Sequence, residues 1–288
     1  MNVPNPQNNP YRWFRQRATV SILLLMSALP QAARAQIGPP SSDYWPTEEW
    51  RSSTPEAEGL DGARLQELVD LIAADEQYPD LHSLLVIRHG YLVVEEYFAG
   101  QQADQLHTLQ SVTKSFTSAA IGIAIDKGYI TDVQEPVLGF FPELEGIENV
   151  DSRKRAMTLE DLLTMRSGND YHERGPGSPH YQLNELPRGW TEFVLNRPME
   201  TDPGTTYQYD SGGVILMSAI LKVRAGEHAD AFLAEHLFAP LGIEQFFWMR
   251  NAEGHPHTGG GLMLRSRDMA KFGLLYPVSY THLRAHET

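Results

Sequence analysis

The sequence contains no cysteine among its 288 residues. This absence excludes disulfide bonds, thiol nucleophiles, iron–sulfur clusters, thiolate zinc sites and an acylated N-terminal cysteine. Basic residues are also scarce, because 23 Lys and Arg stand against 37 Asp and Glu, for a net charge of −14. Such a surface repels phosphate backbones and anionic lipid, so we expect no nucleic-acid partner. With 41% hydrophobic residues, the composition is that of one soluble globular domain or at most two.

No apolar run has the roughly twenty residues that a membrane span needs. The longest apolar run near the N-terminus is Val20–Leu29. It follows the arginines Arg12, Arg15 and Arg17 and precedes an A-x-A cleavage site at Ala33–Ala35. The layout predicts a secretory signal over residues 1–35, with a membrane anchor as the alternative. We expect cleavage before Gln36 and an exported protein, periplasmic or secreted, with no stable membrane span.

The C-terminal residues 277–288 have no helical or strand periodicity. Codons for Val278 to Thr288 can be written to match a transposase adapter used in preparing sequencing libraries. We therefore interpret residues 277–288 as a sequencing-adapter scar, with an ordinary polar tail as the alternative. On this hypothesis the natural chain continues past Tyr276, and the 288-residue chain is truncated and inactive.

Between the two ends we expect an N-terminal arm over residues 36–58, rich in Pro, Ser and Trp, and one domain over residues 59–276. Asp61 predicts the cap of an amphipathic helix, and two β-rich runs around Arg88-His89-Gly90 predict a hairpin. Further helices are predicted over Ser111–Asp126, Thr158–Met165 with its capping box, a short stretch from Thr191, Gly212–Val223, Phe232–Leu241 and Ser266–Tyr276. The result is one hairpin followed by a mostly helical stretch. The long loop Arg166–Gly189 is expected to form part of a site wall.

Ser111 and Lys114 form an S-x-x-K box at the start of a predicted buried helix. Residues three apart on a helix share a face, so the lysine amine can reach the serine hydroxyl and act as its base. The helix N-terminus adds partial positive charge beside a developing oxyanion. The box alone is weak evidence, and the alternative is a serine cap with a lysine that points to solvent.

Tyr209-Asp210-Ser211 lies just before another predicted helix. The Tyr209 hydroxyl can shuttle a proton or stabilise the neutral lysine, and Ser211 is a possible supporting group that passes a proton to a leaving group. The alternative is a half-buried tyrosine beside a serine helix cap. We expect the Asp210 side chain to face away from Ser111.

Taken together, several segments resemble the serine hydrolases related to class C β-lactamases, a family that includes penicillin-recognising peptidases, esterases and aminohexanoate-oligomer hydrolases. The segments are Ser111–Ser118, Leu162–Gly168, Pro203-Gly204 with Tyr207, Tyr209–Ser211, Gly259–Leu262 and Arg267–Gly273. The resemblance implies an α/β fold with an antiparallel sheet flanked by helices and an all-helical region. It also implies an acyl-enzyme mechanism with Ser111 as nucleophile, Lys114 as base and Tyr209 as partner in proton transfer.

The chain departs from the family at the third motif, a Lys-Thr-Gly or His-x-Gly box on an edge strand. His257-Thr258-Gly259 imitates this box, but it follows Pro256 and leads into glycines with no alternating strand around it. We therefore expect it to be a decoy and the true box, with the closing strands, to lie beyond Tyr276.

Other functional patterns are weaker. Asp210–Gly213 is similar to the nucleophile loop of chymotrypsin-like proteases, but no strand-rich barrel precedes it. His255 and His257 are loop histidines without a carboxylate partner nearby, which is typical of polar surface rather than a metal site. We predict no cofactor and no metal. The function predicted is hydrolysis of an ester or amide, with β-lactams and short amide oligomers among the candidate substrates; the alternative is a penicillin-binding or sensor protein with little turnover.

Overall fold

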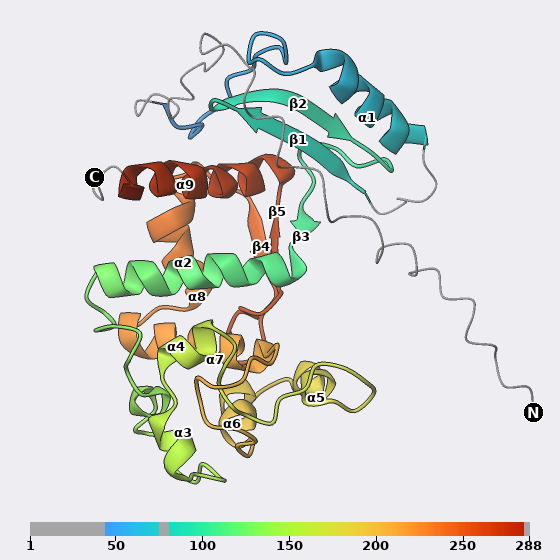
Figure 1. Ribbon diagram of the computed structural model, residues 1–288. Coiled ribbons are helices and arrows are strands. Elements are labelled where there is room, and N and C mark those ends of the chain that lie inside the picture. Colours follow the sequence, from blue (N-terminus) through green and yellow to red (C-terminus); the bar gives the residue numbers. More distant parts are fainter. Residues whose placement is uncertain (1–43, 75–80, 285–288) are drawn as a thin grey trace, which may run out of the picture. The chain divides into compact units, whose positions relative to one another are not determined.

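The computed structural model describes residues 44–74 and 81–284 of the chain. The predicted secretory signal, the first part of the arm and residues 285–288 of the predicted scar lie outside the described residues. Within the described part, no helix combines the length and the apolar character that a bilayer crossing would need. The described residues form a hairpin, a small second sheet and a group of helices (Figure 1).

The predicted hairpin is present. Strands β1 (Ser83–Arg88) and β2 (Tyr91–Tyr97) pair antiparallel, with Arg88 opposite Tyr91. The two connecting residues, His89 and Gly90, have φ values of 52° and 83°. Two positive φ values in a two-residue turn match the right-handed twist of the strands, and glycine adopts such a conformation without steric cost.

Helix α1 (Gly62–Ala74) lies above the hairpin in Figure 1. Its N-terminus is capped as predicted, because Asp61 Oδ1 accepts a hydrogen bond from Arg64 N at 3.1 Å. No residue of α1 is buried, and Leu68 and Leu71 are 41% and 59% exposed. The amphipathic pattern therefore identified the helix correctly, although its apolar face is only partly covered.

The last helix, α9, is longer than the sequence pattern predicted. It contacts β1 below the hairpin in Figure 1 and spans Ser266–Arg284 rather than ending at Tyr276. Proline holds φ near the helical value and costs a helix one hydrogen bond, so Pro277 does not by itself end helical backbone. Phe272 of α9 stacks on Phe116, with ring centroids 3.8 Å apart. The interpretation of residues 277–288 as a scar stays a prediction, because helical backbone says nothing about where a segment comes from.

Three short strands form a second sheet that the sequence analysis missed. The strands are β3 (His107–Thr108), β4 (Phe246–Trp248) and β5 (Leu262–Leu264), and they pair antiparallel in the order β3-β5-β4. Each strand has only two or three residues, which is too short for an alternating pattern to be visible in the sequence. The prediction of a single hairpin followed by helices is wrong in this respect.

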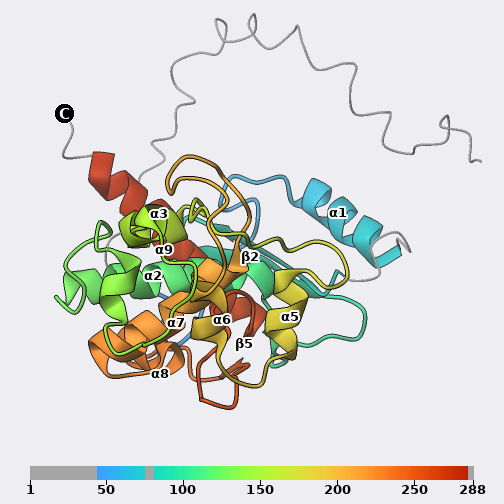
Figure 2. The same cartoon turned by 90° about the horizontal axis from the view of Figure 1, so that it is seen from below.

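Helices α2 and α7 form the centre of the helical region (Figure 2). Helix α2 spans Thr113–Asp126 and follows a one-turn 3-10 helix, η3 (Gln110–Val112). Helix α7 spans Ser211–Ala225, and all its residues from Ser211 to Leu221 are buried. Around them lie the 3-10 helix η4 (Val137–Phe140), the helices α3 (Ser152–Ala156), α4 (Leu159–Leu163), α5 (Pro179–Glu185), α6 (Trp190–Leu195) and α8 (Ala229–Leu233), and the π-helical turn η5 (Ala234–Phe238).

The local helix signals were mostly correct, and the errors lie in boundaries and loops. Thr158 and Asp161 form the predicted capping box at the start of α4, although this helix ends at Leu163. Helix α5 lies inside the segment that we expected to be a long loop, and Ser178 caps it. The segment around Phe232 is helical from Ala229, with a π-helical turn in place of its second half.

Lys154 of α3 is fully buried, which is unusual for a lysine. Its ammonium group donates hydrogen bonds to the carbonyl oxygens of Glu148 at 3.2 Å, Leu195 at 2.5 Å and Arg197 at 2.6 Å. Burial lowers the pKa of this amine to about 8. The side chain thus joins α3 to the C-terminal end of α6, where helix carbonyl groups have no partner within their own helix.

Candidate active site

Ser111 lies in the 3-10 turn η3, between strand β3 and helix α2. The preceding residue, Gln110, has a φ of 45°, in the left-handed region that a non-glycine residue rarely occupies. Its side chain donates to Thr108 Oγ1 at 3.1 Å. This local strain turns the chain sharply from the strand into the helix, and it leaves Ser111 exposed at the turn.

The structure brings together the three side chains that the sequence singled out. The Lys114 amine lies 3.4 Å from Ser111 Oγ, and the Tyr209 hydroxyl donates to the same oxygen at 2.6 Å. The amine also lies 4.8 Å from the centre of the Tyr209 ring. Lys114 comes from the first turn of α2, whereas Tyr209 comes from the segment that enters α7, so the pairing is tertiary.

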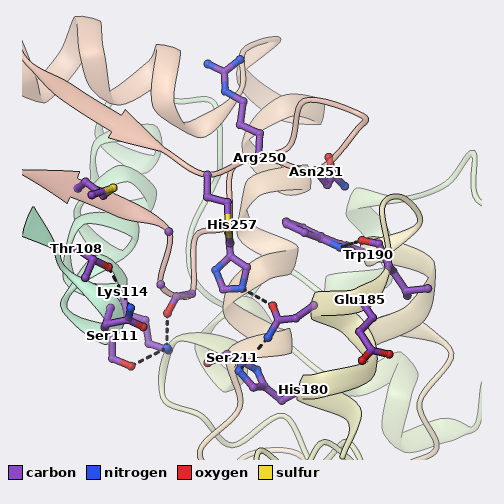
Figure 3. Close-up of a pocket in the computed structure, with 18 of the residues that line it drawn as sticks. Thr108, Ser111, Lys114, His180, Glu185, Trp190, Ser211, Arg250, Asn251 and His257 are labelled. Atoms are coloured by element: carbon purple, nitrogen blue, oxygen red, sulfur yellow. Dashed lines mark hydrogen bonds between the residues drawn. The ribbon is translucent and has the colours of Figure 1, made fainter. Parts of the chain in front are cut away.

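Ser211, the possible supporting residue, is the first residue of α7 and is buried. Its side chain lines the same cavity as Ser111 and Lys114 (Figure 3). Its backbone N–H donates to Glu173 Oε1 at 2.6 Å, so a carboxylate lies at the N-terminus of α7. Glu173 lies in the predicted long loop Arg166–Gly189, and no local motif marks it as part of a site.

His257-Thr258-Gly259 lies on a turn before β5 and not on a strand, as expected. The turn nevertheless belongs to the site, because the Gly259 carbonyl accepts a 2.5 Å hydrogen bond from the Lys114 amine. Thr258 holds the turn in place: its hydroxyl donates to the Val214 carbonyl at 2.8 Å, and its own carbonyl accepts from Thr117 at 2.9 Å. No local pattern around His257-Thr258-Gly259 indicates this role, because the contact with Lys114 joins segments far apart in the sequence.

The interpretation of His257 as polar surface is wrong. The side chain is only 5% exposed and packs edge-on against Trp190, with ring centroids 5.5 Å apart. Its Nε2 lies 3.2 Å from Asn184 Oδ1, and Asn184 also bonds His180. Burial lowers the pKa of His257 to about 4, so the ring is neutral at pH 7.

These residues surround a cavity of about 780 Å³ (Figure 3). Ser111 and Lys114 lie on one side of it, and Trp190, His180 and Glu185 lie on the other. The second group comes from α5 and α6, and Leu186 and Pro187 of the segment that joins these helices also line the cavity, which agrees with the prediction that residues 166–189 contribute a site wall. The cavity is large enough for a small-molecule substrate.

Asp210 is the residue that caps α7, in place of the serine cap that we considered. One of its carboxylate oxygens accepts from Gly213 N at 2.8 Å and the other from Ser167 Oγ at 2.8 Å. Both bonds direct the carboxylate toward the helix end and the Ser167 loop. Burial is the main reason that the pKa of Asp210 is raised to about 6.

Asp210→Asn is expected to change the pH dependence of stability but leave turnover within about threefold. The folded pKa of about 6 lies above the ordinary value of 3.8, so the folded protein holds the proton more tightly and the contribution of Asp210 to stability falls as pH rises from about 4 to 6. Asparagine keeps the cap and has no such proton. The stability of the variant relative to wild type should therefore rise by about 3 kcal/mol across that window. Urea unfolding at several pH values measures the difference, and a constant difference would contradict the prediction.

One group among the described side chains has the spacing of a metal site. Ligand atoms of Asp170, His172 and Glu200 lie within 4.8 Å of one another. Asp170 is already bonded to Arg197 at 2.7 Å, and His172 and Glu200 are exposed, so the group is accounted for as a surface ion-pair network. We assign no metal to it.

The sequence profile of the beta-lactamase family matches residues 66–285. The chain belongs to the beta-lactamase family. This confirms the family resemblance derived from the sequence motifs, and the α/β fold of antiparallel sheets and helices agrees with it. The match covers every described element except the first residues of α1.

Several known proteins are similar to this beta-lactamase family member. It is 28% identical over 228 residues to a 6-aminohexanoate-dimer hydrolase of Paenarthrobacter ureafaciens, covering 72% of this chain and 56% of the relative. It is 29% identical over 165 residues to a lovastatin esterase of Penicillium rubens, covering 51% and 41% of the two chains. A beta-lactamase/D-alanine carboxypeptidase from Yersinia pestis has the same fold, with a TM-score of 0.57 at 20% identity and coverage of 74% and 68%. The chain thus spans about half the length of the curated relatives that it matches, and these are named as amide and ester hydrolases.

Proposed function

We propose that the protein is an exported serine hydrolase that cleaves an ester or amide bond through an acyl-enzyme on Ser111. The observation that carries the proposal is the position of Ser111 Oγ, which has the Lys114 amine at 3.4 Å and the Tyr209 hydroxyl at 2.6 Å. A serine hydroxyl becomes a useful nucleophile only when an adjacent group removes its proton. Esters, short amide oligomers and β-lactams are the candidate substrates.

The proposed reaction has two halves. The Lys114 amine takes the Ser111 proton as Oγ forms a bond to the substrate carbonyl carbon, and the Ser111 N–H stabilises the resulting oxyanion. Tyr209 then donates its proton to the leaving oxygen or nitrogen as that bond breaks, and the Lys114 ammonium returns a proton to Tyr209. Water attacks the acyl-enzyme by the same transfers and releases the acid.

The contact between Lys114 and Gly259 supports this assignment. The Gly259 carbonyl oxygen accepts a hydrogen bond from the Lys114 amine at 2.5 Å and so holds the amine beside Ser111. This contact limits the rotamers of a long flexible side chain. The buried Thr117 and Thr258 fix the carbonyl in turn. The lysine is thereby pre-positioned before substrate arrives.

A fluorophosphonate probe tests the nucleophile directly. We expect peptide mass spectrometry to find the label on Ser111 in the full-length protein. A label on Ser211 would refute the assignment. The alternative, a binding or sensor protein on the same scaffold, predicts a stable adduct with substrate and no turnover, so a burst of one equivalent without further product would favour it.

Tyr209→Phe is expected to lower kcat about a hundredfold while KM changes less than threefold. The hydroxyl acts on proton transfer, which matters in the transition state, rather than on ground-state contacts. Steady-state kinetics with p-nitrophenyl acetate measures both constants. Tyr207→Phe is the matched control, since that ring is 60% exposed and its hydroxyl donates to Met165 Sδ rather than to Ser111. Unchanged turnover in Tyr209→Phe would remove this residue from the site.

Export is the remaining part of the proposal. The support is the order of arginines, apolar run and A-x-A site in residues 1–35, which lie outside the described residues. N-terminal sequencing of the mature protein should begin at Gln36, and a chain that still starts at Met1 would contradict export.

A further inference from the structure

Apolar side chains collect on the face of the second sheet that borders the cavity. Phe247 of β4 lies directly opposite Met263 of β5, and Thr108 of β3 lies opposite Met263 on the other side. All three line the cavity, as does Met249 just after β4. Because side chains alternate along a strand, the neighbouring residues on β4 and β5 point to the opposite face of the sheet. On that face Trp248, Leu262 and Leu264 are buried, and Phe246, which packs on Phe238, is partly buried.

The cavity-facing side chains are poorly covered by the protein itself. Phe247 is 54% exposed and Met249 is 45% exposed. Single exposed apolar residues are common, but adjacent ones beside a nucleophile are typical of a surface that binds a ligand. We call Phe247, Met249 and Met263 the apolar shelf.

Glycines connect the apolar shelf to the nucleophile. Gly259, Gly260 and Gly261 line the cavity between the shelf and Lys114 and place no side chain there. A Cβ atom at Gly261 would lie 2.9 Å from His257 Cβ and 3.1 Å from Met249 Cβ, so this position has no room for a larger residue. A substrate chain can therefore pass over the backbone of these three glycines from Ser111 to the shelf.

The two sides of Ser111 differ in a way that assigns the shelf to one part of the substrate. Tyr209 bonds Ser111 Oγ at 2.6 Å from the segment that enters α7, whereas the shelf residues belong to β4, the residue after it and β5. The leaving group must approach Tyr209 to receive its proton. The acyl part of the substrate, bonded to the same carbonyl carbon, then extends into the cavity.

We propose that the apolar shelf binds an aliphatic acyl chain, so that the protein prefers esters or amides of medium-chain aliphatic acids. This inference rests on the proposed acyl-enzyme function and names its substrate class. The opposite wall combines the polar side chains of His180, Asn184 and Glu185 with the apolar Leu186, Pro187 and Trp190. We assign the main contact with the chain to the shelf, on one side. Full burial of one methylene group of the substrate raises affinity about fourfold, and contact on one side should raise it about twofold for each methylene.

The test is a series of p-nitrophenyl esters that share one leaving group and differ in the acyl chain, from acetate to butyrate and hexanoate. In the full-length protein we expect kcat/KM for hexanoate, corrected for intrinsic reactivity, to exceed that for acetate by at least tenfold. Phe247→Ala and Met263→Ala should reduce this ratio to about two or three. Val223→Ala, which removes a 54% exposed apolar side chain on α7 that does not line the cavity, is the matched control and should keep the ratio.

Three outcomes separate this inference from the proposed function. A ratio that is the same in the wild type, the shelf variants and the control would overturn the shelf, while labelling of Ser111 would leave the serine hydrolase intact. Acetate esters of longer alcohols give a second arm: if Phe247→Ala changes their rates instead, the shelf binds the leaving group and the inference is wrong. Absence of both labelling and ester hydrolysis would refute the proposed function itself.

Discussion

Replacing Ser111 with alanine is expected to abolish hydrolysis of a chromogenic acyl ester, with a loss of at least about ten thousandfold in kcat. The reason is chemical, because no acyl-enzyme forms without the hydroxyl. Lys114→Ala should be nearly as damaging, since the amine 3.4 Å from Ser111 Oγ is the base that makes this oxygen nucleophilic. Losses of this size arise when the members of a site act as a unit. Release of p-nitrophenol from the acetate ester, followed at high enzyme concentration, measures the residual rate.

Controls for this prediction lie on the same helix. Ser118 is an exposed serine of α2, and Lys127 is an exposed lysine at its C-terminal end. Ser118→Ala and Lys127→Ala should each keep wild-type turnover and an unchanged thermal melt. Retention of more than a tenth of the activity in Ser111→Ala would show that another nucleophile acts, with Ser211 as the first to examine.

Lys154→Met is expected to destabilise the folded protein by about 3–5 kcal/mol. Methionine has nearly the same length but cannot donate a hydrogen bond, so the carbonyl oxygens of Glu148, Leu195 and Arg197 lose this donor; the Leu195 bond is buried and the other two are partly buried. Each unsatisfied buried carbonyl costs about 1–3 kcal/mol, part of which is offset because the variant no longer has to desolvate a charged amine. Urea unfolding followed by circular dichroism measures the change.

Arg155→Met is the matched control, because this exposed neighbour on the same short helix should change stability by less than about 0.5 kcal/mol. An unfolding midpoint for Lys154→Met equal to that of the control would mean that the three hydrogen bonds contribute no net stability. Since Lys154 bonds Glu148, Leu195 and Arg197, none of which lines the cavity, any variant that still folds should keep its ester turnover per folded molecule.

The parts of the fold that could be predicted from the sequence depend on interactions within one or two turns of chain. The capping box at Thr158 and Asp161, the cap at Asp61 and the turn at His89-Gly90 each involve residues at most three apart. Their energies arise locally, so their signals are visible in a short window of sequence. The same holds for the S-x-x-K spacing, because residues three apart on a helix turn must share a face.

The features that were predicted wrongly depend on contacts between segments that are distant in the sequence. Strands β3, β4 and β5 exist because distant segments pair with one another, and two or three residues carry no periodicity of their own. Asp210 rather than Ser211 caps α7, because its carboxylate accepts hydrogen bonds from both Gly213 N and the distant Ser167 Oγ. His257 is buried against Trp190 and Asn184, which come from segments distant in the sequence.

The sequence by itself therefore determined the candidate nucleophile and base, the hairpin, the central helices and the family. Tyr209 was already expected to act with Ser111, and the fold brings its hydroxyl to the serine. Only the tertiary structure decided the rest of what surrounds Ser111: the Gly259 carbonyl on Lys114 and the apolar shelf of Phe247, Met249 and Met263. The physical reason is range. Local propensities and caps act between neighbours in the chain, whereas the geometry of a site is set by packing between segments such as α2, α7 and β5, whose contacts no short stretch of sequence contains.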